Sequence, residues 1–281
     1  PRRLPHFTGC SLLFFDSKFM PGLETFLSLD NDFDSIFSLK VKVNKICLPT
    51  FVQNPNISPI MFSYEAYKSS LNRFELKHAP AMLFLEGDST LLTEGKRICV
   101  VGSRNATREG IRRASSISSY LCNQGIIVVS GLASGIDTVA HTVAIEKGRT
   151  IAVLGTSLNN CYPKENLELL NIIKTNHLAI SQFSENYPTN RQNFPIRNRT
   201  MALISDATII VEASEKSGTQ HQGWEALRIG RKLLIMENVM NVSWAKEMIN
   251  YGAQILTREN YHILISEIPV RNFSDNLLAW V

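Results

Sequence analysis

Several hallmarks of membrane, secreted and metal-binding proteins are missing from this chain of 281 residues. No apolar run reaches the length that spans a bilayer, and the first residues lack the charged, apolar and small-residue order of a signal peptide. The five cysteines stand singly, with no Cys-x-x-Cys spacing and no paired histidines nearby, which indicates neither a zinc site nor a disulfide framework. We therefore expect a cytoplasmic protein that holds no metal and no other cofactor.

Two familiar nucleotide-binding signatures are absent as well. The turn Gly102-Ser-Arg-Asn-Ala-Thr107 lacks the second and third glycines of G-x-G-x-x-G, and no G-x-x-x-x-G-K-[ST] sequence occurs. The next apolar run is followed by Ser130-Gly131, where a dinucleotide-binding protein has an acid that binds the ribose diol. These absences argue against hydride chemistry on NAD, and phosphate binding here does not require nucleotide hydrolysis.

Short apolar runs alternate with helix-length segments through most of the chain. Its length and its 44% hydrophobic content suit one large domain, or a large and a small one. We predict strands at residues 97–102, 126–130, 150–155, 178–181, 208–212 and 232–236. Helices are predicted at 109–123, 135–147, 164–175, 196–204, 220–229 and 243–250. Apolar strands separated by helices predict an α/β fold with a doubly wound, mostly parallel sheet.

The remaining segments suggest how the chain is divided. A helix at 64–76 and a short strand at 81–85 are expected to lead into the sheet, after a stretch with the composition of a linker at 53–59. The periodicity before that stretch does not settle helix against strand. We predict an N-terminal region of uncertain fold at 1–60, the Rossmann-like domain at 61–265 and a C-terminal tail at 266–281.

The first predicted strand ends at a turn suited to an anion. Gly102, Ser103 and Arg104 precede the helix at 109–123, whose first N–H groups and positive dipole end would add to the arginine charge. The turn therefore predicts a site for one oxyanion, such as phosphate. Basic residues crowd this strand, turn and helix, which indicates either a polyanionic ligand or a solvated helix face. They are Lys96, Arg97, Arg104, Arg108, Arg112 and Arg113.

The segment from Ser130 to Asp137, followed by His141, allows two interpretations. Its glycines would let the backbone approach a second phosphate closely, or the segment is a tight turn that Asp137 caps or braces. For Asp137 and His141 we favour the structural role. A hydrolase couple of Ser130 and His141 is not indicated, because no G-x-S-x-G elbow surrounds the serine.

Arg197 and Arg199 lie near the start of a predicted helix, with Phe194 in front of them. Guanidinium groups bind phosphates in a bidentate way, and an aromatic ring beside them can stack on a base. Alternatively, one arginine pairs with Glu185 or Glu212 and braces the preceding loop. We expect at least one of the two arginines to be structural.

Tyr162 and Lys164 follow the third predicted strand and offer another aromatic and cationic pair at the same edge of the sheet. A Tyr-Pro sequence is also a common turn, so this pattern by itself does not decide between binding and structure.

These segments share their order with a known family. They are Val101-Gly-Ser-Arg104, Val129 to Asp137 with His141, Ala152 to Gly155 with Tyr162-Pro163 and Asn166, Ser184-Glu185, Phe194 to Arg199, and Val211 to Ala213 with Ser217-Gly218. Together they resemble the DprA/Smf family over residues 80 to 255. The resemblance implies an extended Rossmann-like fold and a non-enzymatic protein that binds and protects single-stranded DNA. It further implies a homodimer that loads a RecA-type recombinase in transformation or recombination.

The resemblance and the sheet-edge motifs together predict the binding residues. The expected DNA-phosphate contacts are Gly102, Ser103, Arg104, Gly110, Ser130, Gly131, Lys164, Arg197, Asn198 and Arg199. The expected base-stacking residues are Tyr162 and Phe194. No catalytic residue is predicted.

The chain also departs from the family pattern. Glu109 stands where an aromatic residue is usual, and its carboxylate would repel a phosphate unless it caps the helix. The segments 219–224 and 236–238 also differ from the family pattern.

Two alternative functions remain. One is a LOG-like nucleotide phosphoribohydrolase, indicated by Gly218-Thr219 with Glu225, and the other is a sensor that binds a small nucleotide without turning it over. The missing P-G-G before Gly218 argues against the hydrolase.

Overall fold

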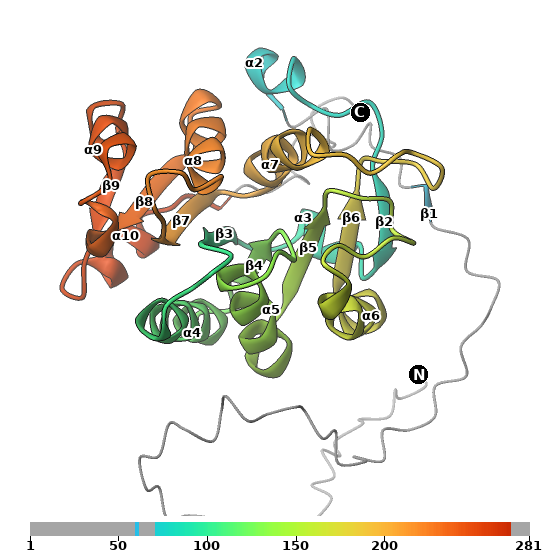
Figure 1. The fold of residues 1–281 in the computed structure, drawn as a ribbon, viewed down its shortest axis with the longest axis horizontal. Coiled ribbons are helices and arrows are strands. Elements are labelled where there is room, and N and C mark those ends of the chain that lie inside the picture. The colour runs from blue at the N-terminus through green and yellow to red at the C-terminus, as the bar shows by residue number, and fades with distance from the viewer. Residues whose placement is uncertain (1–59, 62–70, 271–281) are drawn as a thin grey trace, which may run out of the picture. The chain divides into compact units, whose positions relative to one another are not determined.

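The computed structural model describes residues 60–61 and 71–270, which form a nine-stranded sheet with helices on both faces (Figure 1). The strands are β1 (Ile60–Met61), β2 (Phe84–Gly87), β3 (Arg97–Gly102), β4 (Ile127–Ser130), β5 (Thr150–Leu154), β6 (Leu178–Ser181), β7 (Ala207–Glu212), β8 (Lys232–Met236) and β9 (Gln254–Leu256). The α-helices are α2 (Arg73–Leu76), α3 (Thr90–Thr93), α4 (Arg108–Asn123), α5 (Ile136–Lys147), α6 (Leu167–Asn176), α7 (Asn193–Ile204), α8 (Thr219–Arg228), α9 (Ser243–Asn250) and α10 (Tyr261–Ser266). Short 3-10 turns are η2 (Lys164–Asn166) and η3 (Glu237–Val239).

The strand order is β1-β2-β6-β5-β4-β3-β7-β8-β9. In this spatial order, all neighbouring strands from β6 through β5, β4, β3, β7 and β8 to β9 run parallel. By contrast, β2 is antiparallel to β6, and β1 is antiparallel to β2. The chain builds outward from β3 to β6, then returns to place β7 on the other side of β3. The order therefore reverses between β3 and β7, and ligands of such sheets bind beyond the carboxyl ends of the strands near this point.

The strands are buried on both faces because each face is covered by helices. Along β3, Ile98 and Val100 pack with α4 and α5, while Cys99 and Val101 belong to the core formed with α7, α8 and α9. Figure 1 shows α4, α5 and α6 on one side of the sheet and α7, α8 and α9 on the other. Alternate side chains of a strand point to opposite faces, which accounts for the continuous apolar runs in the sequence.

The predicted doubly wound α/β fold is confirmed. The sequence analysis missed β9 and α10, because three strand residues and six helical residues are too short to show a period. Ile268 is buried in the core, so the packed domain extends beyond the predicted boundary at 265. Residues 1–59, 62–70 and 271–281 lie outside the described residues, and with them most of the predicted N-terminal region, much of the predicted helix at 64–76 and most of the tail. In the part of the chain that is described, no helix has the length and apolar character needed to cross a membrane.

Candidate functional site at the carboxyl edge of the sheet

Five predicted binding residues line one hollow of about 70 Å³ at the carboxyl edge of the sheet. We call it the carboxyl-edge hollow. Its predicted members are Arg104, Gly131, Tyr162, Phe194 and Arg197, and its other members are Ala133, Ser134 and Pro163. They come from the connections after β3, β4 and β5 and from α7. Parallel strands bring these connections together although their residues are far apart in the sequence.

An arginine and two aromatic rings form the outer wall of the hollow. The ring centroids of Tyr162 and Phe194 are 5.3 Å apart, and the Arg104 Cζ atom lies 5.6 Å from the Phe194 centroid. Tyr162 is 53% exposed. Gly155 makes room for Phe194, because a Cβ atom there would lie 2.7 Å from Phe194 Cδ1. The wall thus presents a cation and an accessible ring, a combination that suits a nucleotide.

Arg197 forms the floor and is only 4% exposed. Its Nη1 atom donates to the carbonyl oxygens of Val153, at 2.8 Å, and of Gly131. A Cβ atom on residue 131 would lie 1.9 Å from Nη1, so this close approach requires glycine. Burial lowers the pKa of Arg197, and the Asp137 carboxylate opposes that shift. The floor therefore carries a guanidinium held in place by backbone oxygens.

Asp137 and His141 brace this region from inside. The Asp137 Oδ2 atom accepts hydrogen bonds from the backbone N–H groups of Gly131, at 3.1 Å, and Ala133, at 3.4 Å. His141 Nδ1 lies 2.8 Å from the Thr150 hydroxyl oxygen, and burial lowers the pKa of His141 to about 3. The imidazole is therefore neutral at neutral pH. The favoured structural role of both residues is confirmed.

Three other residues predicted to contact phosphate, Ser130, Ser103 and Gly102, make contacts with other parts of the chain. The Ser130 hydroxyl is fully buried and donates to the Val100 carbonyl at 2.7 Å. A phosphate contact through Ser130 would need this bond to break. The Ser103 carbonyl accepts from the Ile136 N–H at 3.1 Å, and a Cβ atom on Gly102 would lie 2.6 Å from Ile136 Cγ1. The turn that carries Arg104 is thus packed firmly against α5.

A carboxylate of the chain itself occupies the start of α4, where the sequence predicted a phosphate. The Thr107 N–H donates to Glu212 Oε1 at 2.9 Å, and the Thr107 hydroxyl donates to Oε2. A Cβ atom on Gly110 would lie 2.3 Å from Glu212 Oε2, and the Gly110 N–H donates to the Thr107 hydroxyl. The helix dipole therefore meets an internal anion. This corrects the predicted phosphate site at Gly110, because the glycine admits Glu212.

Glu212 was missed as a partner of α4 because it lies 105 residues beyond Thr107 in the sequence. It ends β7, next to the end of β3, and Gly102 and Glu212 are paired in the sheet register. The backbone repeats this link, since the Ser103 N–H donates to the Glu212 carbonyl at 2.8 Å. Only the strand order brings these two ends together.

Lys164, Asn198 and Arg199 do not line the hollow. Lys164 is exposed at the start of η2, and Asn198 is half-buried on α7. Arg199 Nε lies 3.1 Å from Glu225 Oε2, and Arg228 pairs with the same carboxylate at 2.6 Å. At least one arginine of the pair is therefore structural, as expected, but its partner is Glu225 and not Glu185 or Glu212.

Glu109 does not line the hollow either. Its carboxylate pairs with Arg112 at 2.8 Å and with Arg113 at 3.2 Å, in a separate groove along α4. The hydrogen bond and positive charge of these arginines lower the pKa of Glu109. Because Glu109 lines the groove and not the hollow, the expected repulsion between its carboxylate and a phosphate in the hollow has no support in the geometry.

The sequence matches a protein family and several of its curated members. Residues 58–267 match the family described as DNA recombination-mediator protein A. The DNA processing protein DprA of Bacillus subtilis is 35% identical over 198 residues, which cover 69% of this chain and 66% of that protein. The DprA of Streptococcus pneumoniae is 38% identical over 65% of this chain and 66% of its own length. The chain thus spans less than two thirds of these two relatives. Protein Smf of Borreliella burgdorferi is 28% identical, over 94% of this chain and 92% of that protein.

Two solved structures share the fold. The X-ray structure of DprA from Streptococcus pneumoniae superposes with a TM-score of 0.62 at 31% identity, covering 70% of each chain. A structure described as giving insights into the unique single-stranded DNA binding mode of DNA processing protein A from Helicobacter pylori has a TM-score of 0.63. It is 28% identical and covers 69% of this chain and 92% of that chain.

Proposed function

The chain belongs to the DNA recombination-mediator protein A family, and we propose that it binds single-stranded DNA at the carboxyl-edge hollow. The observation that carries the proposal is the arrangement of Arg104 over the Phe194 ring, beside the exposed ring of Tyr162. Single strands are bound by cations that follow the phosphates and by rings on which bases stack. The hollow offers both within one short stretch of surface.

The size of the hollow supports a polymer rather than an enclosed small molecule. Its volume of about 70 Å³ is far below the roughly 300 to 1,000 Å³ of sites that enclose a small ligand. A phosphate group of a strand enters the hollow, while the neighbouring nucleotides lie across Tyr162 and the surrounding surface. Arg197 adds a positive charge from below.

The protein acts by binding, without catalysis, in the processing of DNA during transformation or recombination. The alternative as a phosphoribohydrolase needs a free acid at Glu225, and that carboxylate is held by Arg199 and Arg228. Loading of a RecA-type recombinase, assembly as a homodimer and a cytoplasmic location complete the proposal. They rest on membership of the family, and each stays a prediction.

The decisive experiment compares two arginine variants. Arg104→Ala removes one phosphate contact, so we expect weaker binding of a fluorescent oligonucleotide. The slope of log K on log salt should fall by about 0.7, the value for one contact to a single strand. Arg149→Ala is the matched control, because Arg149 is exposed just before β5, at the opposite edge of the sheet. An affinity and a slope that are unchanged in Arg104→Ala would refute the proposed site.

Incubation with free mononucleotides under the same conditions tests the hydrolase alternative. The proposal predicts no release of base, phosphate or ribose from them. Saturable turnover that Glu225→Gln abolishes and Arg104→Ala retains would establish the hydrolase instead.

A further inference from the structure

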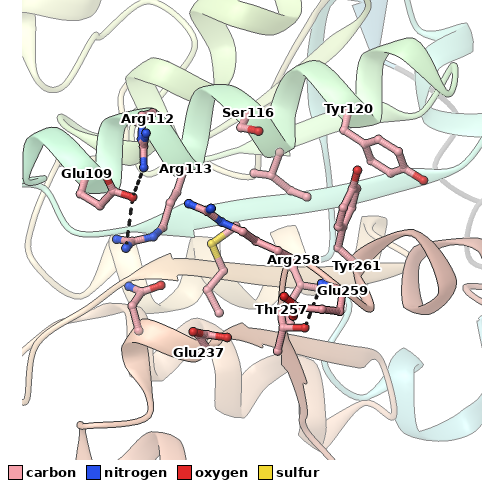
Figure 2. Close-up of a pocket in the computed structure, with 14 residues that line it drawn as sticks. Glu109, Arg112, Arg113, Ser116, Tyr120, Glu237, Thr257, Arg258, Glu259 and Tyr261 are labelled. Atoms are coloured by element: carbon pink, nitrogen blue, oxygen red, sulfur yellow. Dashed lines mark hydrogen bonds and ion pairs between the residues drawn. The ribbon is translucent and has the colours of Figure 1, made fainter.

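A second and much larger opening lies along α4 (Figure 2). Its volume is about 740 Å³, within the roughly 300 to 1,000 Å³ typical of sites for small ligands. It runs between α4 and the segments that follow β8 and β9, and it shares no lining residue with the carboxyl-edge hollow. We call it the α4 groove. The proposed function at the hollow makes no use of it.

Guanidinium groups gather at one end of the α4 groove. Arg112 and Arg113 project from α4, and Figure 2 shows Arg258 extending from the segment after β9 toward them. One carboxylate, Glu109, pairs with both α4 arginines, at 2.8 Å and 3.2 Å. Three positive groups thus gather at this end, and Glu109 pairs with two of them. Arginine forks bind a phosphate through paired hydrogen bonds, and exposed ion pairs such as those of Glu109 exchange partners readily.

Aromatic and apolar groups form the other end. The rings of Tyr120 and Tyr261 meet edge to face, with centroids 4.7 Å apart. Ile117 and Leu256, both buried, line the floor beside them. Tyr120 lies seven residues after Arg113 on α4, which corresponds to about 10 Å along the helix axis. A nucleotide separates its phosphate from its base by a comparable distance.

Carboxylates on the wall opposite α4 limit what the groove accepts. Glu237 and Glu259 line this wall (Figure 2), and both residues are exposed. They accept hydrogen bonds from ribose hydroxyls or from an exocyclic amino group, and they repel additional phosphates. The lining therefore combines three cationic side chains with these carboxylates and two aromatic rings, which favours a ligand with one anionic group and one ring.

We propose that the α4 groove binds a single nucleotide, with its phosphate between Arg113 and Arg258 and its base against Tyr261. This goes beyond the proposed binding of a strand at the hollow. The nucleotide comes either from the free pool or from one unit of a DNA strand, and both sources offer the same chemistry.

The test is calorimetric titration of the full chain with deoxyadenosine monophosphate and, separately, with inorganic phosphate. We expect saturable binding of the nucleotide, weaker binding of phosphate alone, and a loss of about tenfold or more in Arg258→Ala. Glu109→Gln should tighten binding several-fold, because it releases two guanidinium groups for the ligand. A purely structural role of Glu109 would not produce this opposite sign. Arg149→Ala, which changes an exposed side chain outside both sites, should leave nucleotide affinity unchanged.

Three results would overturn the proposal. They are the absence of saturable nucleotide binding in both the natural and the Glu109→Gln proteins, equal affinity for phosphate and nucleotide, and a loss in Arg104→Ala without one in Arg258→Ala. A competition experiment then identifies the source. Displacement of a bound oligonucleotide by the nucleotide, together with weaker oligonucleotide binding in Arg258→Ala, assigns the groove to a strand. Undisturbed oligonucleotide binding assigns it to the free nucleotide.

Discussion

The carboxyl-edge hollow and the α4 groove both contain arginines, but they hold them in different ways. In the hollow, Arg197 is buried and fixed by two backbone oxygens, while Arg104 lies over an aromatic ring. In the groove, Arg112 and Arg258 are exposed, and Arg112 pairs with the exposed carboxylate of Glu109. Buried charges depend on their partners for stability, whereas exposed ion pairs contribute little. Substitution of the buried Arg197 should therefore affect folding, whereas substitution of the exposed groove arginines should affect binding alone.

The largest expected effect is that of Arg197→Ala. Removing the guanidinium leaves Asp137 buried without its neighbouring positive charge, which we expect to cost about 3 to 5 kcal/mol of unfolding free energy. Urea denaturation measures this loss. Arg149→Ala serves as the control, because an exposed side chain at the other edge should change stability little.

The pH dependence of Arg197→Ala sharpens this prediction. Burial raises the pKa of Asp137 in the folded protein, so the folded state binds more protons than the unfolded state between the two pKa values. Stability therefore falls as pH rises through that window. Loss of Arg197 raises this pKa further, so the variant should be less destabilised in acid than at neutral pH. Equal destabilisation at both pH values would contradict a charge-based role for the floor.

Tyr162→Ala tests the outer wall. The ring is 53% exposed, so we expect unchanged thermal stability but a loss of about 1 to 3 kcal/mol in oligonucleotide binding, the contribution of one stacked base. Tyr162→Phe keeps the ring and should bind as the natural protein does. If the alanine variant retained full affinity in anisotropy titrations, this wall would not be part of the interface.

Glu212→Ala tests the link between the β7 end and the turn that carries Arg104. Loss of the carboxylate removes a partner of Thr107 at the start of α4, and removal of a helix cap costs about 0.5 to 2 kcal/mol. We expect a lower melting temperature together with weaker oligonucleotide binding. Thr107→Ala combined with Glu212→Ala should cost less than the sum of the two changes, because both remove the same contact. Additive costs would show that the two residues act independently.

Glu109→Tyr should have the smallest effect on DNA binding. Its carboxylate lines the α4 groove and pairs with exposed arginines, so the substitution adds no ring to the hollow. We expect unchanged oligonucleotide affinity and salt dependence in anisotropy titrations. A marked gain in affinity would place this position on the path of the strand and would merge the two regions into one binding surface.

The short apolar runs were sufficient to predict the strands at the centre of the sheet. Ile98 to Val101 and Ile127 to Val129 are apolar at every position, and helix-length segments separate them. Such runs must be buried on both faces, which leaves a helix-covered parallel sheet as the consistent architecture. The same order of strands predicted that Arg104, Tyr162 and Phe194 share an edge, and they do.

Side-chain direction could not be predicted in the same way. The sequence indicated a helix from 196 and α7 begins at Asn193, so Arg197 and Arg199 lie inside the helix in both cases. Residues two apart on a helix point about 200° apart, so these arginines face opposite sides. One enters the floor of the hollow and the other pairs with Glu225. The helical period separates the two side chains, but the strands and the helix that pack against α7 decide which partner each one meets.

By itself, the sequence determined the sheet, its helices and the edge at which ligands bind, because these follow from local periodicity and from burial on both faces of a strand. Only the tertiary structure decided which charges meet. Glu212 reaches the start of α4 across 105 residues, and Arg258 faces Arg113 across the α4 groove. Such contacts depend on strand order and helix placement, to which no local pattern corresponds. The energy between two charges depends on the distance between them in space, and folding sets this distance.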